Sequence, residues 1–274
     1  RHEQPEQHVG DESGAGAHSR PQIPNNLDSW LHISETGLVT AFTGKVEMGQ
    51  NIRTSLAQQV AEELRVPLSS VHMLMGDTDL TPWDMGTFGS RTTPQMGTQL
   101  RKVAASARAV LIQMAAEHWN VPEANLTVED GQIRDPKTRR SMTYANLTQG
   151  QKLTKVILDE PPVTPATNWK IAGNSAPKKN VRDFVTGAHK YSSDVVRPGM
   201  LHGRVVHPKT LGSKLIAAGP LDKARFPNAQ VIIKGNLVGV VAPSEWEAIQ
   251  AAQHVGAGTK WSDWKGLPGS NRLY

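Results

Sequence analysis

Two short polar segments contain the residues best suited to binding chemistry, residues 47–51 ("EMGQN") and residues 86–93 ("GTFGSRTT"). Each combines glycine, which lets a ligand approach the backbone closely, with hydrogen-bond donors. The donors are Gln50 in the first segment and Ser90, Arg91 and Thr92 in the second, where the arginine can pair with a phosphate. Each segment precedes a predicted helix, whose first amides attract anions. If a sheet brings the two helix starts together, they form a cradle for a phosphorylated ligand; ordinary helix caps are the alternative.

No catalytic or metal-binding set accompanies these segments. The ten histidines are dispersed, without the spacing of metal ligands. Glu62 and Glu63 are adjacent on a predicted helix and cannot both face one substrate, and Asp77 and Asp79 are predicted to cap or brace a loop. The sequence contains no G-x-S-x-G, P-loop or H-E-x-x-H motif. We therefore predict no catalytic residue and no metal ligand in this chain.

Composition excludes several classes of protein. The 274 residues contain no cysteine, so the chain forms no disulfide and binds no iron–sulfur cluster or zinc through cysteine. The net charge of +5 is spread along the chain without a Lys/Arg block, so no nucleic-acid partner is expected. No apolar run approaches the length of a membrane span, so we expect no transmembrane segment.

The periodicity of the first half predicts the elements that position the two segments. "GLVTAFTGKV" alternates as a strand does, and residues 52–65 repeat apolar side chains at fourfold spacing until Pro67 ends the helix. "SSVHMLMG" is a second strand, which makes a β-α-β unit. Residues 94–119 form a long apolar stripe, with Thr93 as the expected N-cap and Pro94 in the first turn. Asp130-Gly131 predicts a hairpin.

The second half is predicted to be a small α+β domain. Residues 151–179 are irregular and rich in proline, so they mark a domain boundary. Beyond them, we expect strands in "AHKYSSDV", "MLHGRVVHP", "AQVIIKG" and "NLVGVVAPS", a helix in "SEWEAIQAAQHV" and a last strand near "TKWSDW". Residues 1–27 have few apolar side chains and are expected to form an extended polar arm.

These motifs resemble a known family. "GKVEMGQNIRTSLAQQVAEEL", "MGDTDLTP" and "GTFGSRTTPQMGTQLRKVAASAR" are similar to the molybdopterin-binding large subunit of the xanthine dehydrogenase/aldehyde oxidase (molybdenum hydroxylase) family, of the isoquinoline 1-oxidoreductase β-subunit type. The resemblance implies an α+β fold, in which part of a molybdopterin-binding domain (β-α-β-α) precedes an α/β hammerhead domain. The expected divisions are an arm (1–27), the molybdopterin-binding domain (28–150), a linker (151–179), the hammerhead domain (180–265) and a tail (266–274).

The same resemblance implies which residues contact the cofactor. By motif, the contacts fall on Met48, Gly49 and Gln50, and on the later loop at Gly89, Ser90, Arg91 and Thr92. The sequence departs from the family at Asn51, where glycine is usual. Asparagine tolerates left-handed backbone better than other non-glycine residues, so we expect the turn to persist.

The implied function is a component of a molybdenum hydroxylase that oxidises an aldehyde or an N-heteroaromatic with water as the oxygen source. The implied cofactor is molybdopterin with molybdenum, with the cytosine dinucleotide form as one option, and a [2Fe-2S] centre would lie on a partner chain. The general-base glutamate and the rest of the large subunit are expected on further sequence or a separate chain. A small iron–sulfur subunit and a cytochrome c subunit are the other expected partners. The expected location is the periplasm, with the cytoplasm as the alternative.

Two other functions remain open from the sequence. A non-catalytic scaffold could retain this fold without the cofactor, and a phosphate- or nucleotide-binding module could use the same two segments. Molybdenum in the intact assembly would distinguish the first function from both.

Overall fold

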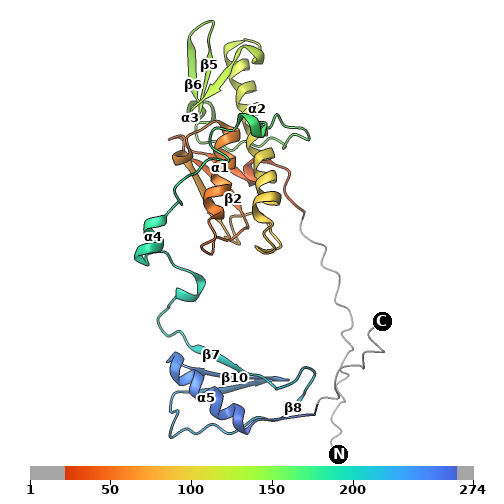
Figure 1. Ribbon diagram of the computed structural model, residues 1–274, viewed down its shortest axis with the longest axis vertical. Helices are drawn as coiled ribbons and strands as arrows, with labels where there is room; N and C mark the ends of the chain where they lie inside the picture. Colours follow the sequence, from red (N-terminus) through yellow and green to blue (C-terminus); the bar gives the residue numbers. More distant parts are fainter. Residues whose placement is uncertain (1–21, 264–274) are drawn as a thin grey trace, which may run out of the picture. The chain divides into compact units, whose positions relative to one another are not determined.

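The computed structural model describes residues 22–263 and divides between His189 and Lys190 into two compact units (Figure 1). Most of the predicted arm (1–21) and the predicted tail (266–274) lie outside the described residues. The end of the arm is structured: Asn26 forms a β-bridge with Val156, and Leu27 is fully buried. The division between His189 and Lys190 lies beyond the irregular segment 151–179, which belongs to the first unit.

The first sheet carries the predicted β-α-β unit. Strand β1 (Leu31–Ile33) pairs antiparallel with β2 (Val39–Thr43), and β2 pairs parallel with β3 (Val71–Met75). Along β2 the exposure alternates, with Val39, Ala41 and Thr43 facing the core. Parallel pairing requires a crossover between the strands, and α1 (Ile52–Leu64) provides it. The β-α-β prediction is confirmed.

Helix α1 packs its apolar side chains into the core of the first unit. Leu56, Val60 and Leu64, which follow one another at fourfold spacing, are at most 1% exposed. The helix ends at Arg65, which adopts the left-handed conformation ahead of Pro67. The core also takes in one face of α2 (Thr98–Trp119), which lies beside α1 (Figure 1).

The start of the second helix differs from the prediction. A π-helical turn, η3 (Thr92–Gly97), precedes α2, and the Arg91 carbonyl accepts the amide of Gln95. Thr93 lies inside this turn and does not cap a helix, so the predicted N-cap is wrong. Gly97 approaches α1 closely, because a Cβ atom there would collide with the side chain of Gln59. The sequence signals of a helix cap come from neighbouring residues, so they give no information about the contact between Gly97 and α1.

A hairpin extends the first unit beyond α2. Strands β4 (Thr127–Glu129), β5 (Gln132–Asp135) and β6 (Arg140–Thr143) form a three-stranded antiparallel sheet, followed by α3 (Tyr144–Thr148). Asp130 and Gly131 both have positive φ, at 50° and 70°. Two such residues between paired strands are typical of a type I′ turn, so the hairpin prediction is confirmed.

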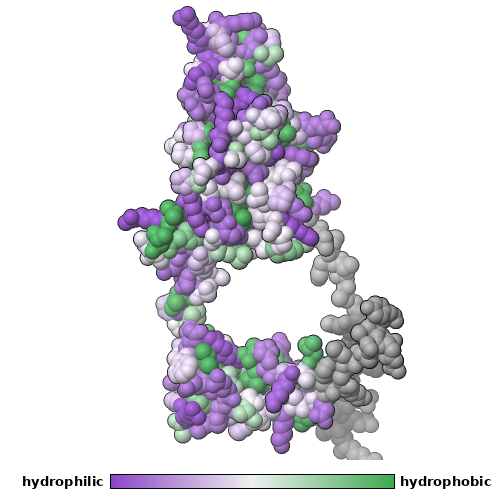
Figure 2. All heavy atoms as spheres, viewed as in Figure 1, coloured by the Kyte–Doolittle hydropathy of each residue, from purple (hydrophilic) through white to green (hydrophobic). Residues whose placement is uncertain are grey.

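The end of the first unit contains a short helix that the sequence did not predict. Helix α4 (Val181–Thr186) exposes Val181 and Val185, and Figure 2 shows a hydrophobic patch over it. The strand predicted in "AHKYSSDV" is wrong, because this stretch contains only a 3₁₀ turn at Ser192–Asp194. Tyr191 and Asp194 close that turn: the Asp194 carboxylate accepts the Tyr191 amide at 3.0 Å.

The second unit is a small α+β structure. Its elements are β7 (His202–Val206), β8 (Leu215–Ala217), β9 (Gln230–Lys234), β10 (Leu237–Ala242), α5 (Glu245–Gly258) and β11 (Lys260–Trp261). The sheet order is β7-β10-β9, antiparallel throughout, and β8 pairs with β11. Ala248, Ala251 and Val255 of α5 are fully buried in a core shared with β10. The other predicted strands and the helix of this unit are confirmed, whereas β8 was not predicted.

At the level of class, the predicted α+β fold is confirmed by these mixed helices and sheets. No helix within residues 22–263 combines the length and the apolar character needed to cross a bilayer.

Candidate functional site

The two predicted segments lie at the same edge of the first sheet. Because β2 and β3 are parallel, their carboxyl ends meet there, and the loops that follow them become neighbours. We call residues 44–51 the first loop and residues 76–91 the second loop. Lys45 joins them: its Nζ lies 2.9 Å from Asp84 Oδ1 and donates to the carbonyl of Gly86 at 2.6 Å. The condition on which the predicted cradle depended is therefore met.

The backbones of the first and second loops also lie close together. The amide of Val46 donates to Thr87 Oγ1 at 2.8 Å. A Cβ atom on Gly44 would lie 2.5 Å from Cβ of Asp84 and 2.8 Å from the carbonyl oxygen of Pro82, closer than atoms can pack. Glycine at position 44 is thus required for the two loops to meet.

A cavity of about 420 Å³ opens between the loops. This volume is within the usual range of small-molecule sites. Its lining residues come from both loops and both helix starts: Met48, Gln50, Ile52, Thr87, Phe88, Ser90, Thr92 and Thr93. Four of the predicted contacts, Met48, Gln50, Ser90 and Thr92, line the cavity, whereas Gly49, Gly89 and Arg91 lie in the same loops without lining it.

The carboxylate of Glu47 accepts hydrogen bonds from amides of the first loop and of the first turn of α1. Its Oε1 accepts from the amides of Gly49 at 2.8 Å and Asn51 at 2.9 Å, and its Oε2 accepts from the amide of Arg53 at 3.0 Å. The prediction that these amides stand ready for an anionic ligand is therefore wrong, because the chain supplies its own anion. Burial raises the pKa of Glu47, but the three amides and the charge of Lys178 outweigh it and hold that pKa below its ordinary value.

The first loop is also braced from within. Gln50 Nε2 donates to the carbonyl of Val46 at 2.9 Å, while its Oε1 accepts the amide of Met48 at 2.6 Å. Gly49 has φ of 108°, and Asn51 is left-handed with φ of 71°, as expected for the departure at position 51. The side chain of Gln50 thus shapes the loop, and its outer surface forms part of the cavity wall.

The second loop contributes the exposed positive charge. Gly89 and Ser90 have positive φ, at 62° and 54°, which turns the chain into η3. The guanidinium of Arg91 lies 5.6 Å from the centre of the Phe88 ring, a cation–π distance, and the arginine is exposed. A cation between two residues whose hydroxyl groups line the cavity, Ser90 and Thr92, suits a ligand that carries phosphate.

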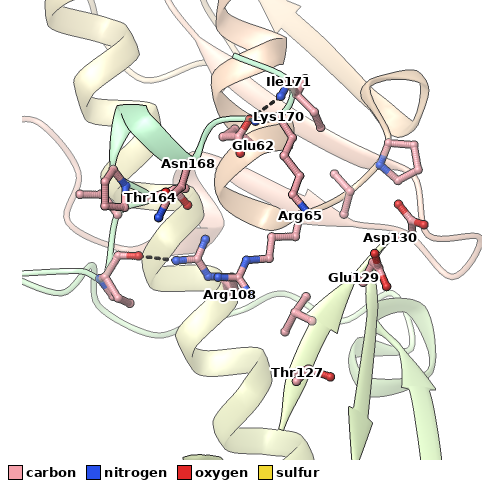
Figure 3. Close-up of a pocket in the computed structure, with 16 residues that line it drawn as sticks. Glu62, Arg65, Arg108, Thr127, Glu129, Asp130, Thr164, Asn168, Lys170 and Ile171 are labelled. Atoms are coloured by element: carbon pink, nitrogen blue, oxygen red, sulfur yellow. Dashed lines mark hydrogen bonds between the residues drawn. The ribbon is translucent and has the colours of Figure 1, made fainter. Parts of the chain in front are cut away.

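A second cavity, of about 830 Å³, lies at the other end of α1 (Figure 3). Its walls are the end of α1, the middle of α2, the β4–β5 hairpin and residues 162–171. In Figure 3 the side chains of Arg65 and Arg108 converge inside it, with Glu129 and Asp130 on the hairpin beyond. Arg108 is buried and donates to the carbonyls of Glu63 and Pro162, so it is committed to structure.

Glu62 lines this cavity, and both Glu62 and Glu63 bind the segment that runs beside it. Oε2 of Glu62 accepts three successive amides, those of Lys170, Ile171 and Ala172, at 2.9, 2.6 and 3.0 Å. The two carboxylates are 6% and 0% exposed, and both point to the segment 161–179. Although they are adjacent on a helix, both carboxylates bind this one segment, and their role as anchors was not predicted.

Two residues of the candidate site were missed from the sequence. Glu47 had a signal, since an acidic residue next to a helix start stabilises the helix dipole. Lys178, which donates to the carbonyl of Gly49 at 2.9 Å, is 129 positions away in sequence and had no local signal. Within residues 22–263, no three His, Asp or Glu side chains come together in a way that could hold a metal ion.

Comparison with known proteins shows the family to which the sequence belongs. The sequence matches the profile of a family described as a molybdopterin cofactor-binding domain, over residues 11–195. It is 36% identical over 238 residues to the B subunit of nicotinate dehydrogenase from Pseudomonas putida, a match that covers 84% of this chain and 20% of that protein. It is 30% identical over 233 residues to the beta subunit of isoquinoline 1-oxidoreductase from Brevundimonas diminuta, which covers 70% of this chain and 30% of that protein.

Among solved structures, a Cu,Mo-CO dehydrogenase aligns with a TM-score of 0.39 and 31% sequence identity, over 43% of this chain and 15% of that one. The matches define a class of molybdopterin-dependent oxidoreductases. The chain belongs to the molybdenum hydroxylase family, as a molybdopterin-binding large-subunit sequence. It spans between a fifth and a third of the length of the two curated relatives. The predicted resemblance is confirmed, and the individual cofactor contacts stay predictions.

Proposed function

We propose that the cavity between the first and second loops binds molybdopterin, and that the chain is part of a molybdenum hydroxylase that oxidises an aldehyde or an N-heteroaromatic. The observation that carries the proposal is the meeting of the two loops. The segments that resemble the family's cofactor contacts, far apart in sequence, line one cavity of about 420 Å³. The family match covers both loops.

The side chains around this cavity fit the proposed cofactor. Ser90, Thr92 and Thr93 offer hydroxyl groups to ring nitrogens and phosphate oxygens, and Met48 and Phe88 offer apolar surface to a flat ring. When bound, molybdopterin holds the molybdenum that supplies two-electron oxidation chemistry. The carboxylate of the first loop already neutralises the start of α1, so the phosphate is assigned to the opposite side of the cavity, where the exposed arginine of the second loop lies.

This chain would bind and orient the cofactor and leave proton transfer to another group. The described residues that line the cavity include no titratable side chain. A general base is therefore needed from elsewhere, and we assign it to a glutamate on further sequence or a separate chain. Water is the proposed oxygen source. Both named relatives are subunits, which supports partners; we propose a small iron–sulfur subunit with a [2Fe-2S] centre and a cytochrome c subunit.

Three finer assignments belong to the same proposal. The second unit is proposed to be an α/β hammerhead domain, with the molybdopterin-binding part before it. The cofactor is proposed to be the cytosine dinucleotide form, which mass spectrometry of the released pterin would identify. The proposed location is the periplasm, and cell fractionation that finds the assembly in the cytoplasm would contradict it.

The substitution Gly49→Val tests the first loop. Gly49 has φ of 108°, a conformation that a β-branched residue adopts only under strain of about 1–3 kcal/mol. We expect molybdenum and pterin per mole of purified assembly to fall about tenfold, the equivalent of about 1.4 kcal/mol. Elemental analysis and pterin fluorescence measure both. The matched control is Gly37→Val, which places the same kind of strain (φ 84°) in the β1–β2 turn, away from the cavity. Equal cofactor loss in both variants would contradict the assignment.

The substitution Arg91→Glu tests the second loop. Reversing the charge removes a hydrogen bond to phosphate of about 1.5–3 kcal/mol and adds repulsion, so cofactor content should fall at least about tenfold. Arg139→Glu, at another exposed arginine, reverses a charge in the β5–β6 turn and should keep the cofactor. A wild-type assembly without molybdenum would instead favour the non-catalytic scaffold, and binding of free ATP or NAD would favour a nucleotide-binding module.

A further inference from the structure

Residues 161–179, called the strap, run along α1 in the opposite direction to the helix. The strap meets α1 first at its carboxyl end, where the amide of Thr164 donates to Glu63 Oε2 at 2.8 Å. It then reaches Gln58, whose Nε2 donates to the carbonyls of Ile171 and Asn174 at 2.9 and 2.8 Å. The order of contacts along the strap is the reverse of their order along the helix. This irregular segment is therefore held to α1 over the length of the helix.

The strap ends at the amino end of α1 with two consecutive lysines. The amide of Lys179 donates to Thr54 Oγ1 at 2.9 Å, and its Nζ donates to the carbonyl of Leu68 at 3.2 Å. With its backbone fixed in this way, the strap brings the neighbouring side chain, Lys178, to the first loop. Lys178 also lies over the ring of Phe184 in α4, with its Nζ 4.0 Å from the ring centre.

Lys178 makes two contacts with the first loop. Its Nζ donates to the carbonyl of Gly49 at 2.9 Å and lies 3.9 Å from Glu47 Oε1. The amide of Gly49 meanwhile donates to Glu47. The peptide groups on both sides of Gly49 are thus fixed, one by a carboxylate and one by an ammonium. Since glycine restricts its own backbone least, these two bonds help to hold Gly49 in its conformation, together with the bonds that Gln50 makes within the loop.

The surroundings strengthen both contacts. The side chain of Glu47 is 1% exposed and that of Lys178 is 24% exposed, so water screens their attraction less than on an open surface. A hydrogen bond from an ammonium to a carbonyl is also stronger than one between neutral groups. Glu47 orients the amides of the loop, whereas Lys178 fixes the carbonyl of Gly49.

From these contacts we propose that Lys178 is a positioning residue of the molybdopterin site, and that the strap is part of that site through it. Lys178 holds the carbonyl of Gly49 and the carboxylate of Glu47, and so keeps Met48 and Gln50 against the cavity. The inference rests on the proposed function. It adds a residue that lies outside the two loops and outside the cavity lining.

The test compares Lys178→Met, Lys178→Arg and Lys170→Met in the assembled protein. Lys170 is an exposed lysine of the same strap, and its anchor to Glu62 is a backbone amide that the substitution retains. The rate at which molybdenum and pterin are lost from the purified protein at fixed temperature should rise about tenfold in Lys178→Met, equivalent to about 1.4 kcal/mol. Lys178→Arg and Lys170→Met should both lose molybdenum and pterin at the wild-type rate.

Amide hydrogen exchange gives a second measurement that does not depend on the cofactor. In Lys178→Met, the amides of Gly49, Asn51 and Arg53 should exchange faster, while the β4–β5 hairpin stays as protected as in the wild type. Cofactor loss at the wild-type rate in Lys178→Met overturns the inference, and so does a loss that Lys178→Arg does not restore. A wild-type assembly without molybdenum or pterin overturns the proposed function, and the inference with it. Cofactor that is present and retained equally in all variants overturns the inference alone.

Discussion

Replacing Glu63 by leucine is expected to lower the free energy of unfolding of the first unit by about 3–5 kcal/mol. The carboxylate is fully buried, 2.9 Å from Arg101 and 3.4 Å from Arg108. Leucine fills similar space but leaves the buried Arg108 without this counter-charge, and the amide of Thr164 without its acceptor. The loss of a buried partner is far more costly than the net contribution of the intact pair.

Urea unfolding, followed by the fluorescence of tryptophan, measures this effect. Trp30 is 1% exposed in the core of the first unit, so unfolding of that unit changes the emission of this one of the seven tryptophans. The measurement is made in a background where phenylalanine replaces the tryptophans of the second unit, Trp246, Trp261 and Trp264. The matched control is Glu129→Gln, which breaks an exposed ion pair with Arg134 at 3.7 Å and should cost less than about 1 kcal/mol. A Glu63→Leu variant as stable as this control would show that the strap is not anchored at Glu63.

Replacing Glu47 by alanine is expected to affect both stability and cofactor content. Two amides of the first loop and one in the first turn of α1 lose their acceptor, and Lys178 loses its anionic partner. Loss of a carboxylate at a partly buried helix start costs up to about 2 kcal/mol. Because the same amides define the first loop, we also expect molybdenum and pterin to fall at least about tenfold, comparable to about 1.4 kcal/mol.

The effect of Glu47 should depend on pH with a defined sign. Burial raises the pKa of Glu47. The amides of Arg53, Asn51 and Gly49 and the charge of Lys178 together lower it by more than burial raises it, so the folded-state pKa lies below the ordinary value of 4.5. A depressed carboxyl pKa contributes stability that is present above pH 4.5 and is lost as the pH falls through the folded-state pKa. The difference in unfolding free energy between wild type and Glu47→Ala should therefore shrink below pH 4.5. A difference that persists unchanged into acid would contradict the assignment.

The parts of the fold that could be predicted are those whose signals are local. Apolar side chains at fourfold spacing marked α1, and Asp130-Gly131 marked the hairpin, because period and turn chemistry act between near neighbours. The meeting of the two loops could also be foreseen, since a β-α-β unit puts the carboxyl ends of its strands at one edge. Motif resemblance then named the residues around that edge.

The parts that were missed depend on contacts between distant residues. Glu62 and Glu63 accept backbone amides of the strap, and a backbone group carries no residue type to recognise. In sequence, Lys178 is one more lysine of a polar, proline-rich stretch. Glu47 lies in the segment that the sequence singled out. The amides at the start of α1 were nevertheless expected to be free for a ligand, because the segment before the helix contains glycine and polar residues. Irregular segments are thus poorly described by composition when a helix supplies their hydrogen bonds.

The π-helical turn η3 also fixes a phase relation between the second loop and α2. Such a turn closes its hydrogen bonds over one more residue than an α-helical turn does. Removing one residue from η3 would let α2 run as a regular helix from its start. The same deletion would rotate everything before it by about 100° around the helix axis, relative to the buried stripe of α2. Ser90 would then turn away from the cavity that it lines, so a chain with a regular α-helix at this point would lose part of the cavity wall.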